Sequence, residues 1–114
     1  CNATFYGTVT ANQFITSSDL NRKKDIRPIT TYETILSSIN GVHFKWKEGA
    51  GDDIGVIAQE VLPVLPEAVY LTDEGYRVAY MKLIPVLIEA VKSLQGRVTE
   101  LERQIQTVPG KTPA

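Results

Sequence analysis

The residues best suited to chemistry lie in the stretch ITSSDLNRKKD, residues 15–25. Ser18 is followed by Asp19, and Lys23 stands five residues after Ser18 in a short cationic cluster. A serine hydroxyl attacks an acyl group once a neighbouring base removes its proton, and a neutral lysine is such a base. The nearest acyl group is the carbonyl of Ser17. Under this interpretation the chain would cut itself between Ser17 and Ser18.

The same residues also have a purely structural interpretation. Ser18 has the residue type of a helix N-cap, and Asp19 would then favour the positive end of the helix dipole. In an α-helix, at about 100° per residue, the neighbour of Ser18 would be Arg22, which stays protonated and is no base. A pair of Ser18 and Lys23 therefore requires a non-helical loop or a contact between subunits. Both interpretations are open on these residues alone.

Other site chemistries are limited by composition. The chain has one histidine, His43, and one cysteine, Cys1, so a Ser–His–Asp set, a zinc site of the usual kinds and an internal disulfide are not expected. A net charge of −1 argues against a nucleic-acid binder. The longest apolar run, LIPVLIEAV, is interrupted by Pro85 and Glu89 and is too short to cross a bilayer. No metal, cofactor, nucleic acid or membrane partner is expected.

The elements that must position the serine and the lysine are short. Strands are expected from Thr4 to Val9 and from Gln13 to Thr16, where small, β-branched and aromatic residues alternate. A short helix is expected to begin at Thr30 or Thr31 and to end at Gly41. Its apolar stripe consists of Ile35, Leu36 and Ile39.

The middle of the chain predicts further strands. Val42 to Lys47 alternates like a half-buried strand, with Phe44, Trp46 and the later Tyr80 interpreted as core and His43 as exposed. EGAGDD has the composition of a loop, and the residues up to Val61 predict a strand or a short helix. A hairpin follows, with a strand near Ala68 to Leu71, the turn TDEG and the returning strand YRVAY.

The clearest periodicity lies near the end of the sequence. Apolar residues step by three and four over 22 residues, which gives a heptad seam with the β-branched members at a and the leucines at d: Ile84, Leu87, Val91, Leu94, Val98, Leu101 and Ile105. Packing of this helix on its own domain is the alternative, but its polar outer face favours self-association. β-Branched residues at a with leucine at d favour a dimer. Arg97 at g and Glu102 at the following e would pair between parallel helices, and the pattern from Arg97 to Glu102 resembles a trimer-specifying motif, so we expect a trimer.

Three blocks, taken in order, carry a family resemblance: FITSSDLNRKKDI, IGVIAQEVLPVLPEAV and YMKLIPVLIEAVKSLQGRVTELE. From about Phe14 to Ile105 the chain resembles the intramolecular chaperone domain of phage tailspikes and tail fibres, also called peptidase S74. Endosialidase tailspikes, L-shaped tail fibres and neck appendages carry this domain. The blocks also resemble the self-cleaving region of the myelin regulatory factor family of transcription factors.

The resemblance implies a domain that trimerises, brings three β-rich chains into register and then cuts itself off. It implies that the nucleophile is Ser18, that the base is Lys23, and that the cut falls between Ser17 and Ser18. Asn21 stands where the family often has a basic residue, and Lys24 is a second candidate for the base. Asp19 and Glu60 are possible supporting residues, although a structural pairing of Gln59 and Glu60 is the alternative.

Together these observations predict an α+β protein with a small mixed head and a long C-terminal helix in a parallel trimeric coiled coil. Because the sequence does not begin with Met, it is interpreted as a piece of a longer chain. Residues 1–17 would be the stub of an upstream fibre, 18–80 the head, 81–106 the coiled-coil helix and 107–114 a flexible tail. The expected partners are two further copies and the upstream segment of the same chain, in a fibre precursor made in the host cytoplasm. The alternatives are a trimeric module that does not cleave, and the transcription-factor region.

Overall fold

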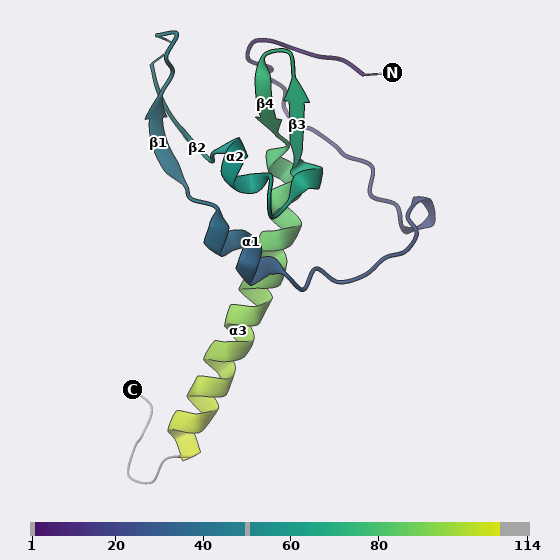
Figure 1. Cartoon of the computed structure of the whole chain (residues 1–114). Helices are drawn as coiled ribbons and strands as arrows, with labels where there is room; N and C mark the ends of the chain where they lie inside the picture. The colour runs from purple at the N-terminus through teal and green to yellow at the C-terminus, as the bar shows by residue number, and fades with distance from the viewer. Residues whose placement is uncertain (1, 50, 108–114) are drawn as a thin grey trace.

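The protein is an α+β molecule, seen here in a computed structural model that describes residues 2–49 and 51–107. Two separate antiparallel strand pairs and several short helices form a head, and a long helix extends from it (Figure 1). This arrangement confirms the expected fold class. The elements in chain order are η1 (Leu20–Arg22), α1 (Tyr32–Ser38), β1 (Val42–Lys45), β2 (Asp52–Gly55), α2 (Ala58–Val61), η2 (Pro66–Ala68), β3 (Val69–Thr72), β4 (Gly75–Val78), η3 (Tyr80–Lys82) and α3 (Leu83–Thr107).

Helix α3 confirms the long helix expected from the heptad pattern. It begins directly after the single turn η3, and Pro85 is tolerated because the backbone N–H groups of a first turn have no partner within the helix. One stripe of α3 packs on the head: Val86 is buried, and Leu83, Ala90 and Ser93 are half-buried. These residues step by three and four like the seam, but they lie about 100° away from it around the helix. The helix therefore uses different faces for the head and for the seam.

The two strand pairs are hairpins. In the first, Val42 of β1 pairs with Gly55 of β2, and Val42 and Phe44 are half-buried while His43 is exposed, as the alternation predicts. In the second, β3 pairs with β4 through the turn TDEG, as expected. Gly75 has a φ of 106° there, a conformation that favours glycine. The residues EGAGDD are only partly a loop, because Asp52 and Asp53 belong to β2.

The core lies where four elements meet. Among the described residues, the buried apolar side chains are Ile35 of α1, Val61 of α2, Ala68 of η2 and Val86 of α3. Helix α1 follows Thr31 as expected but ends at Ser38, before Gly41. The segment up to Val61 contains both of the expected elements in turn, a strand and then a short helix. The small core is consistent with the modest burial available to a short chain.

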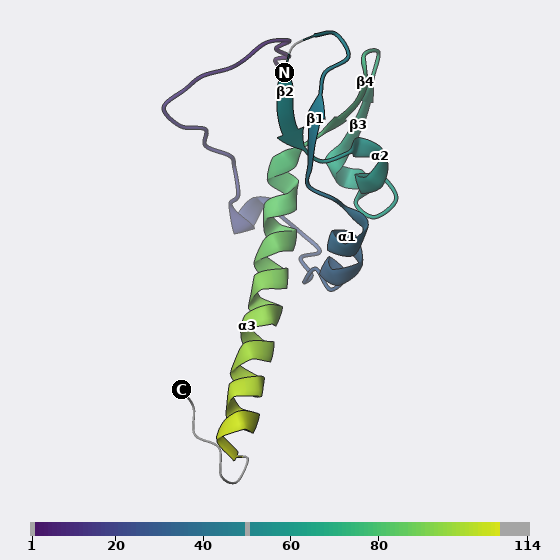
Figure 2. The same cartoon turned by 90° about the vertical axis from the view of Figure 1, so that its left-hand side faces the viewer.

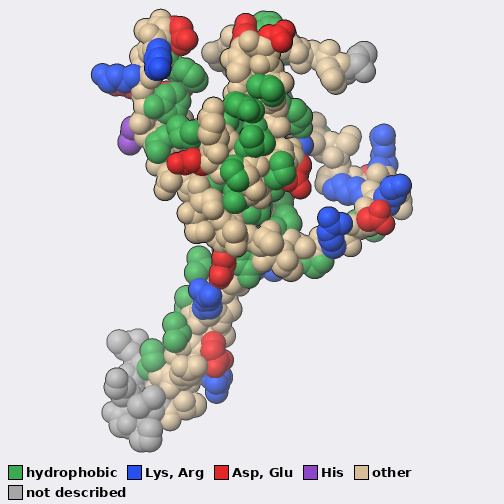
Figure 3. Space-filling view, in the orientation of Figure 1, with side chains coloured by type: hydrophobic (Ala, Val, Ile, Leu, Met, Phe, Trp, Pro, Cys, Tyr) green, Lys and Arg blue, Asp and Glu red, His purple; other side chains and the backbone are tan. Residues whose placement is uncertain are grey.

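The chain is much more open than a compact monomer of its mass. Its accessible surface is 10118 Å², against roughly 6,200 Å² from the general scaling for a 12.6 kDa protein. Its radius of gyration is 19.7 Å, against about 13 Å for a compact domain of this length. The exposed hydrophobic side chains gather on the head and follow one edge of α3 (Figure 3). The single chain therefore leaves a large apolar surface exposed to solvent.

Two sequence expectations are wrong for the single chain. The strands expected from Thr4 to Val9 and from Gln13 to Thr16 do not form, and the segment runs past the head as an extended, exposed strap (Figure 2). A strand needs a neighbour to satisfy its backbone groups, and within the described residues the head has no sheet edge paired with this segment. Trp46 and Tyr80, expected in the core, are 48% and 51% exposed.

Candidate functional site

The loop that carries the candidate serine is built around Asp19. Asp19 is the N-cap of η1, and its Oδ1 accepts a hydrogen bond of 2.9 Å from the backbone N–H of Asn21. The Asp19 carbonyl accepts from Arg22 N at 3.1 Å, and the Leu20 carbonyl accepts from Lys23 N at 3.1 Å. The cap is thus Asp19, so the interpretation of Ser18 as a helix cap is wrong. Asn21, where the family pattern departs, contributes only its backbone to these contacts.

The turn brings Lys23 back to Ser18. Lys23 stands at the end of η1 with φ −116° and ψ 147°, so the chain leaves the helical conformation at this residue. Its Nζ donates a hydrogen bond of 2.7 Å to Ser18 Oγ. The contact thus spans a single 3₁₀ turn, rather than an α-helix, within one chain. The contact is made by Lys23, the first of the two candidate bases, rather than by Lys24.

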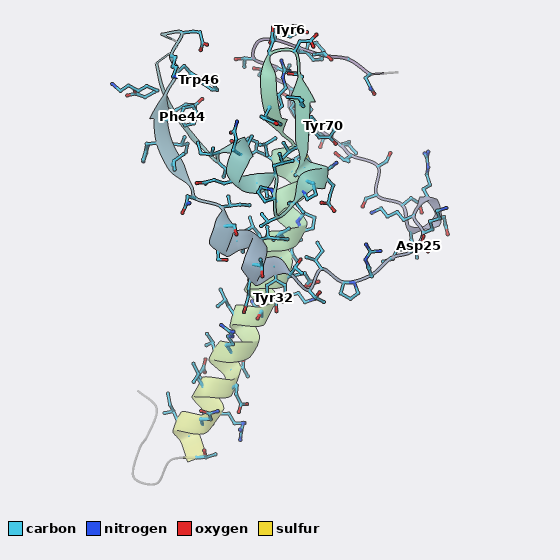
Figure 4. The ribbon with its side chains drawn as sticks, viewed as in Figure 1. Tyr6, Asp25, Tyr32, Phe44, Trp46 and Tyr70 are labelled. Carbon is cyan, nitrogen blue, oxygen red and sulfur yellow. The ribbon has the colours of Figure 1, made fainter. Side chains whose placement is uncertain are left out.

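The loop is connected to the head by an extended linker. Asp25, at the start of the linker, has a φ of 54° and lies beside η1 at the far right of the molecule (Figure 4). Residues 25–31 then line a crevice of about 640 Å³ whose other wall includes Leu65, Lys82 and Val86. Ser18 and Lys23 are exposed in the single chain. The linker thus lies along the head, while the η1 loop itself stands to one side of it with its side chains open to solvent (Figure 1).

Glu60, the other candidate supporting residue, serves a different part of the head. Its Oε1 accepts hydrogen bonds from Asn40 N at 3.2 Å and from Asn40 Nδ2 at 3.4 Å. These bonds tie α2 to the connection between α1 and β1. Gln59 lines an open hollow of about 690 Å³ between the first hairpin and β4, together with the aromatic residues Phe44, Trp46, Tyr76 and Tyr80. Phe44 and Trp46 meet edge to face there, with centroids 4.9 Å apart (Figure 4).

The seam of α3 is exposed along its whole length. Its seven side chains are between 47% and 57% accessible: Ile84, Leu87, Val91, Leu94, Val98, Leu101 and Ile105. On the outer face, the Arg103 guanidinium lowers the pKa of the Glu100 carboxyl through a hydrogen bond. Arg97 forms an ion pair of 3.0 Å with Glu33 of α1, a contact that the heptad pattern did not reveal because it joins residues distant in sequence.

Among residues 2–49 and 51–107, no cluster of histidine, cysteine and carboxylate side chains is arranged to hold a metal ion. In the same part of the chain, no helix has the length and apolar character needed to cross a membrane. The expected flexible tail, residues 107–114, lies outside the described residues except for Thr107. The geometry thus offers a contact between a serine hydroxyl and a lysine amine beside the expected cleavage site, and an apolar helix face that is exposed in the single chain.

A family comparison matches this part of the molecule. Residues 18–70 match the family described as peptidase S74, chaperone of endosialidase. Over this segment, just under half of its length, the chain is similar to the chaperone-of-endosialidase family. The match begins at Ser18 and runs through the η1 loop, α1, both strands of the first hairpin and α2 to the start of β3.

Whole-protein comparisons find long tail fibre proteins. The chain is 32% identical over 110 residues to the long tail fibre protein Gp37 of Enterobacteria phage K3. The aligned region covers 88% of this chain and 9% of that relative. The corresponding protein of Enterobacteria phage T2 is also 32% identical over 110 residues, with 88% and 8% covered. That of Salmonella phage S16 is 29% identical over 112 residues, with 88% and 15% covered. The chain therefore spans only a small part of the length of these relatives.

Proposed function

We propose that this chain is the intramolecular chaperone of a phage tail fibre, and that it trimerises, registers the fibre and releases itself by cleavage between Ser17 and Ser18. The family match and the tail fibre relatives support the chaperone role. The relatives also favour a phage protein over a region of a transcription factor. The observation that carries the cleavage is the contact of 2.7 Å between Lys23 Nζ and Ser18 Oγ.

The proposed reaction begins with attack of Ser18 Oγ on the carbonyl carbon of Ser17. Neutral Lys23 takes the hydroxyl proton across the existing contact and passes it to the Ser18 nitrogen as the C–N bond breaks. An ester then joins the Ser17 carbonyl to Ser18 Oγ, and the Ser18 amine is free. Water hydrolyses the ester, which leaves a carboxylate on Ser17 and restores the Ser18 hydroxyl. The cut would separate residues 1–17 from residues 18–114.

The order of events follows from the exposure of the pair. Lysine acts as a base only in its neutral form, and removal from water favours that form. In the single chain Lys23 is exposed, so the proposal requires assembly to cover the η1 loop. Cleavage would then take place only after three chains have assembled. Asp19 supports the reaction in this scheme by holding the turn that aligns the pair.

The chaperone role follows from the seam. Three copies joined through the proposed coiled-coil segment, residues 81–106, would hold three upstream segments side by side at high effective concentration. Pairing between distant strands is slow because loop closure must precede the contacts that reward it, and a fixed register removes part of that cost. Release of the head, residues 18–80, and of its helix would leave a fibre that unfolds only as a whole. The product would be a virion fibre made as a precursor in the host.

Mass spectrometry of the purified protein tests the cleavage. The wild type should yield residues 1–17 and 18–114, whereas Ser18→Ala and Lys23→Ala should each remain whole. Ser17→Ala and Lys24→Ala are matched controls that should still cut, since the proposal uses only the carbonyl of residue 17 and only the amine of residue 23. Cutting in both Ser18→Ala and Lys23→Ala would reject the dyad. A trimeric wild type that stays whole would instead support a structural module that does not cleave.

A further inference from the structure

The apolar face of α3 is wider near the head than a two-column seam requires. In the heptad frame of the seam, Met81 and Ile88 occupy e positions, and both are more than half exposed. Further along the same column the e positions hold Gln95 and Glu102. The column therefore changes from apolar to polar as the helix leaves the head.

The apolar surface is continuous with the seam and with the head. Tyr80 stands four residues before Ile84, which places it in the d column of the seam, and it is 51% exposed. Its hydroxyl accepts a hydrogen bond of 3.1 Å from Val56 N, and the ring lines the hollow beside β4. Tyr80 and Met81 belong to the turn η3 that leads into α3, and Ile84 and Ile88 follow in the first two turns of α3. They form a single band, which we call the upper band.

Heptad geometry identifies what lies opposite the e column. In a parallel coiled coil, the e positions of one helix lie beside the g positions of the next. The g positions near the head are Leu83 and Ala90, and both are half-buried. Val86, at the adjacent c position, is buried in the core. The g side of each helix is thus the side that carries its own head, so the e side of one copy faces the head of its neighbour.

From these observations we infer that each head covers Met81 and Ile88 of the adjoining copy. This inference rests on the proposed trimer and adds a second interface to it, between a head and a neighbouring helix. The large exposed surface of the single chain is consistent with more burial than the seam alone provides. Because each head would then grip the next helix, the heads and the coil would assemble together rather than independently.

The single methionine of the chain provides the test, since Met81 reports its own coverage through its rate of oxidation by hydrogen peroxide. A variant Glu102→Met adds a second methionine in the same e column, beyond the residues that contact the head. If the coil alone covers the column, the two sites in the trimer oxidise at similar rates. If the neighbouring head covers Met81, that site oxidises more slowly, and peptide mass spectrometry separates the two rates.

A monomeric reference completes the design. The double variant Leu94→Asn with Leu101→Asn places polar groups in the seam far from the head and should sediment as a monomer. In it Met81 should oxidise as fast as an exposed methionine; protection there would mean that the chain covers Met81 by itself and would overturn the inference. Equal rates at both sites in a sedimenting trimer would also overturn it while leaving the trimer intact. A monomeric wild type would instead reject the proposed assembly.

An independent variant examines the other member of the column. Ile88→Gln should raise the midpoint concentration of trimer formation roughly tenfold or more, because it removes apolar burial in all three copies. Gln95→Ala, one heptad further along the column, should change the midpoint little. Equal midpoints for the two variants would contradict coverage by the neighbouring head.

Discussion

The seam makes a quantitative prediction through Leu94→Ala. Leu94 is 57% exposed in the single chain, and a trimer would bury that remainder. Full burial of a leucine side chain is worth about 2 kcal/mol, so the substitution should lose about 1.2 kcal/mol per chain and about 3.6 kcal/mol per trimer. The association constant should fall roughly several hundredfold, and the midpoint concentration should rise about twentyfold. Sedimentation equilibrium over a range of concentrations measures this midpoint.

Gln95→Ala is the matched control, because residue 95 is the next residue of the same helix and lies outside the seam. Its midpoint should stay close to that of the wild type. The Leu94→Ala effect can exceed the transfer value, since a cavity in a packed interface adds its own cost. Equal midpoints for Leu94→Ala and Gln95→Ala would show that the seam is not the subunit interface, and the proposed chaperone mechanism would lose its basis.

Three further predictions concern the head, the helix and the loop. Val61→Ala, in the core, should destabilise the head by about 2 kcal/mol, seen as a lower urea midpoint with an unchanged slope. Gly96→Ala should stabilise α3 by about 1 kcal/mol, because open space surrounds the position and alanine is the better helix former; the melting temperature should rise, and an unchanged or lower one would contradict this. Asp19→Ala should slow cleavage, because loss of the cap destabilises the η1 turn by about 1 kcal/mol, whereas Asp19→Asn should retain most of the rate. Gel electrophoresis over time measures both cleavage rates. Equal rates for the two variants would show that Asp19 has no part in the mechanism.

Sequence reasoning succeeded where local patterns settle the structure. The heptad repeat predicted α3, alternation predicted β1, and TDEG predicted the hairpin of β3 and β4. Each of these signals lies within a few residues of the element it describes. The contact of Ser18 with Lys23 was foreseen as a possibility, but only the structure supplies the one-turn η1 that closes the distance, because the same residues also fit an ordinary helix cap.

The sequence predictions that are wrong concern residues whose structure depends on contacts with distant parts of the sequence. The segment from Thr4 to Val9 has strand composition, but a strand forms only beside a partner. Trp46 and Tyr80 have the residue types of a core, yet the small head leaves them at the edge of an open hollow. The start of β2 was placed in a loop because Asp52 and Asp53 resemble turn residues, although pairing with β1 makes them strand residues. In each case the residue types indicated a conformational preference, but they did not show which residues would lie beside them in the fold.

Arg97 shows how such a distant contact changes an argument about assembly. The sequence pattern pairs Arg97 with Glu102 of a neighbouring helix and so favours a trimer. In the structure, Arg97 already holds Glu33 of its own α1 at 3.0 Å, and both side chains are more than 60% exposed. An exposed ion pair contributes at most about 1 kcal/mol, so exchanging one partner for the other changes the free energy little. The number of chains must then be decided by the packing of the apolar columns rather than by this ion pair.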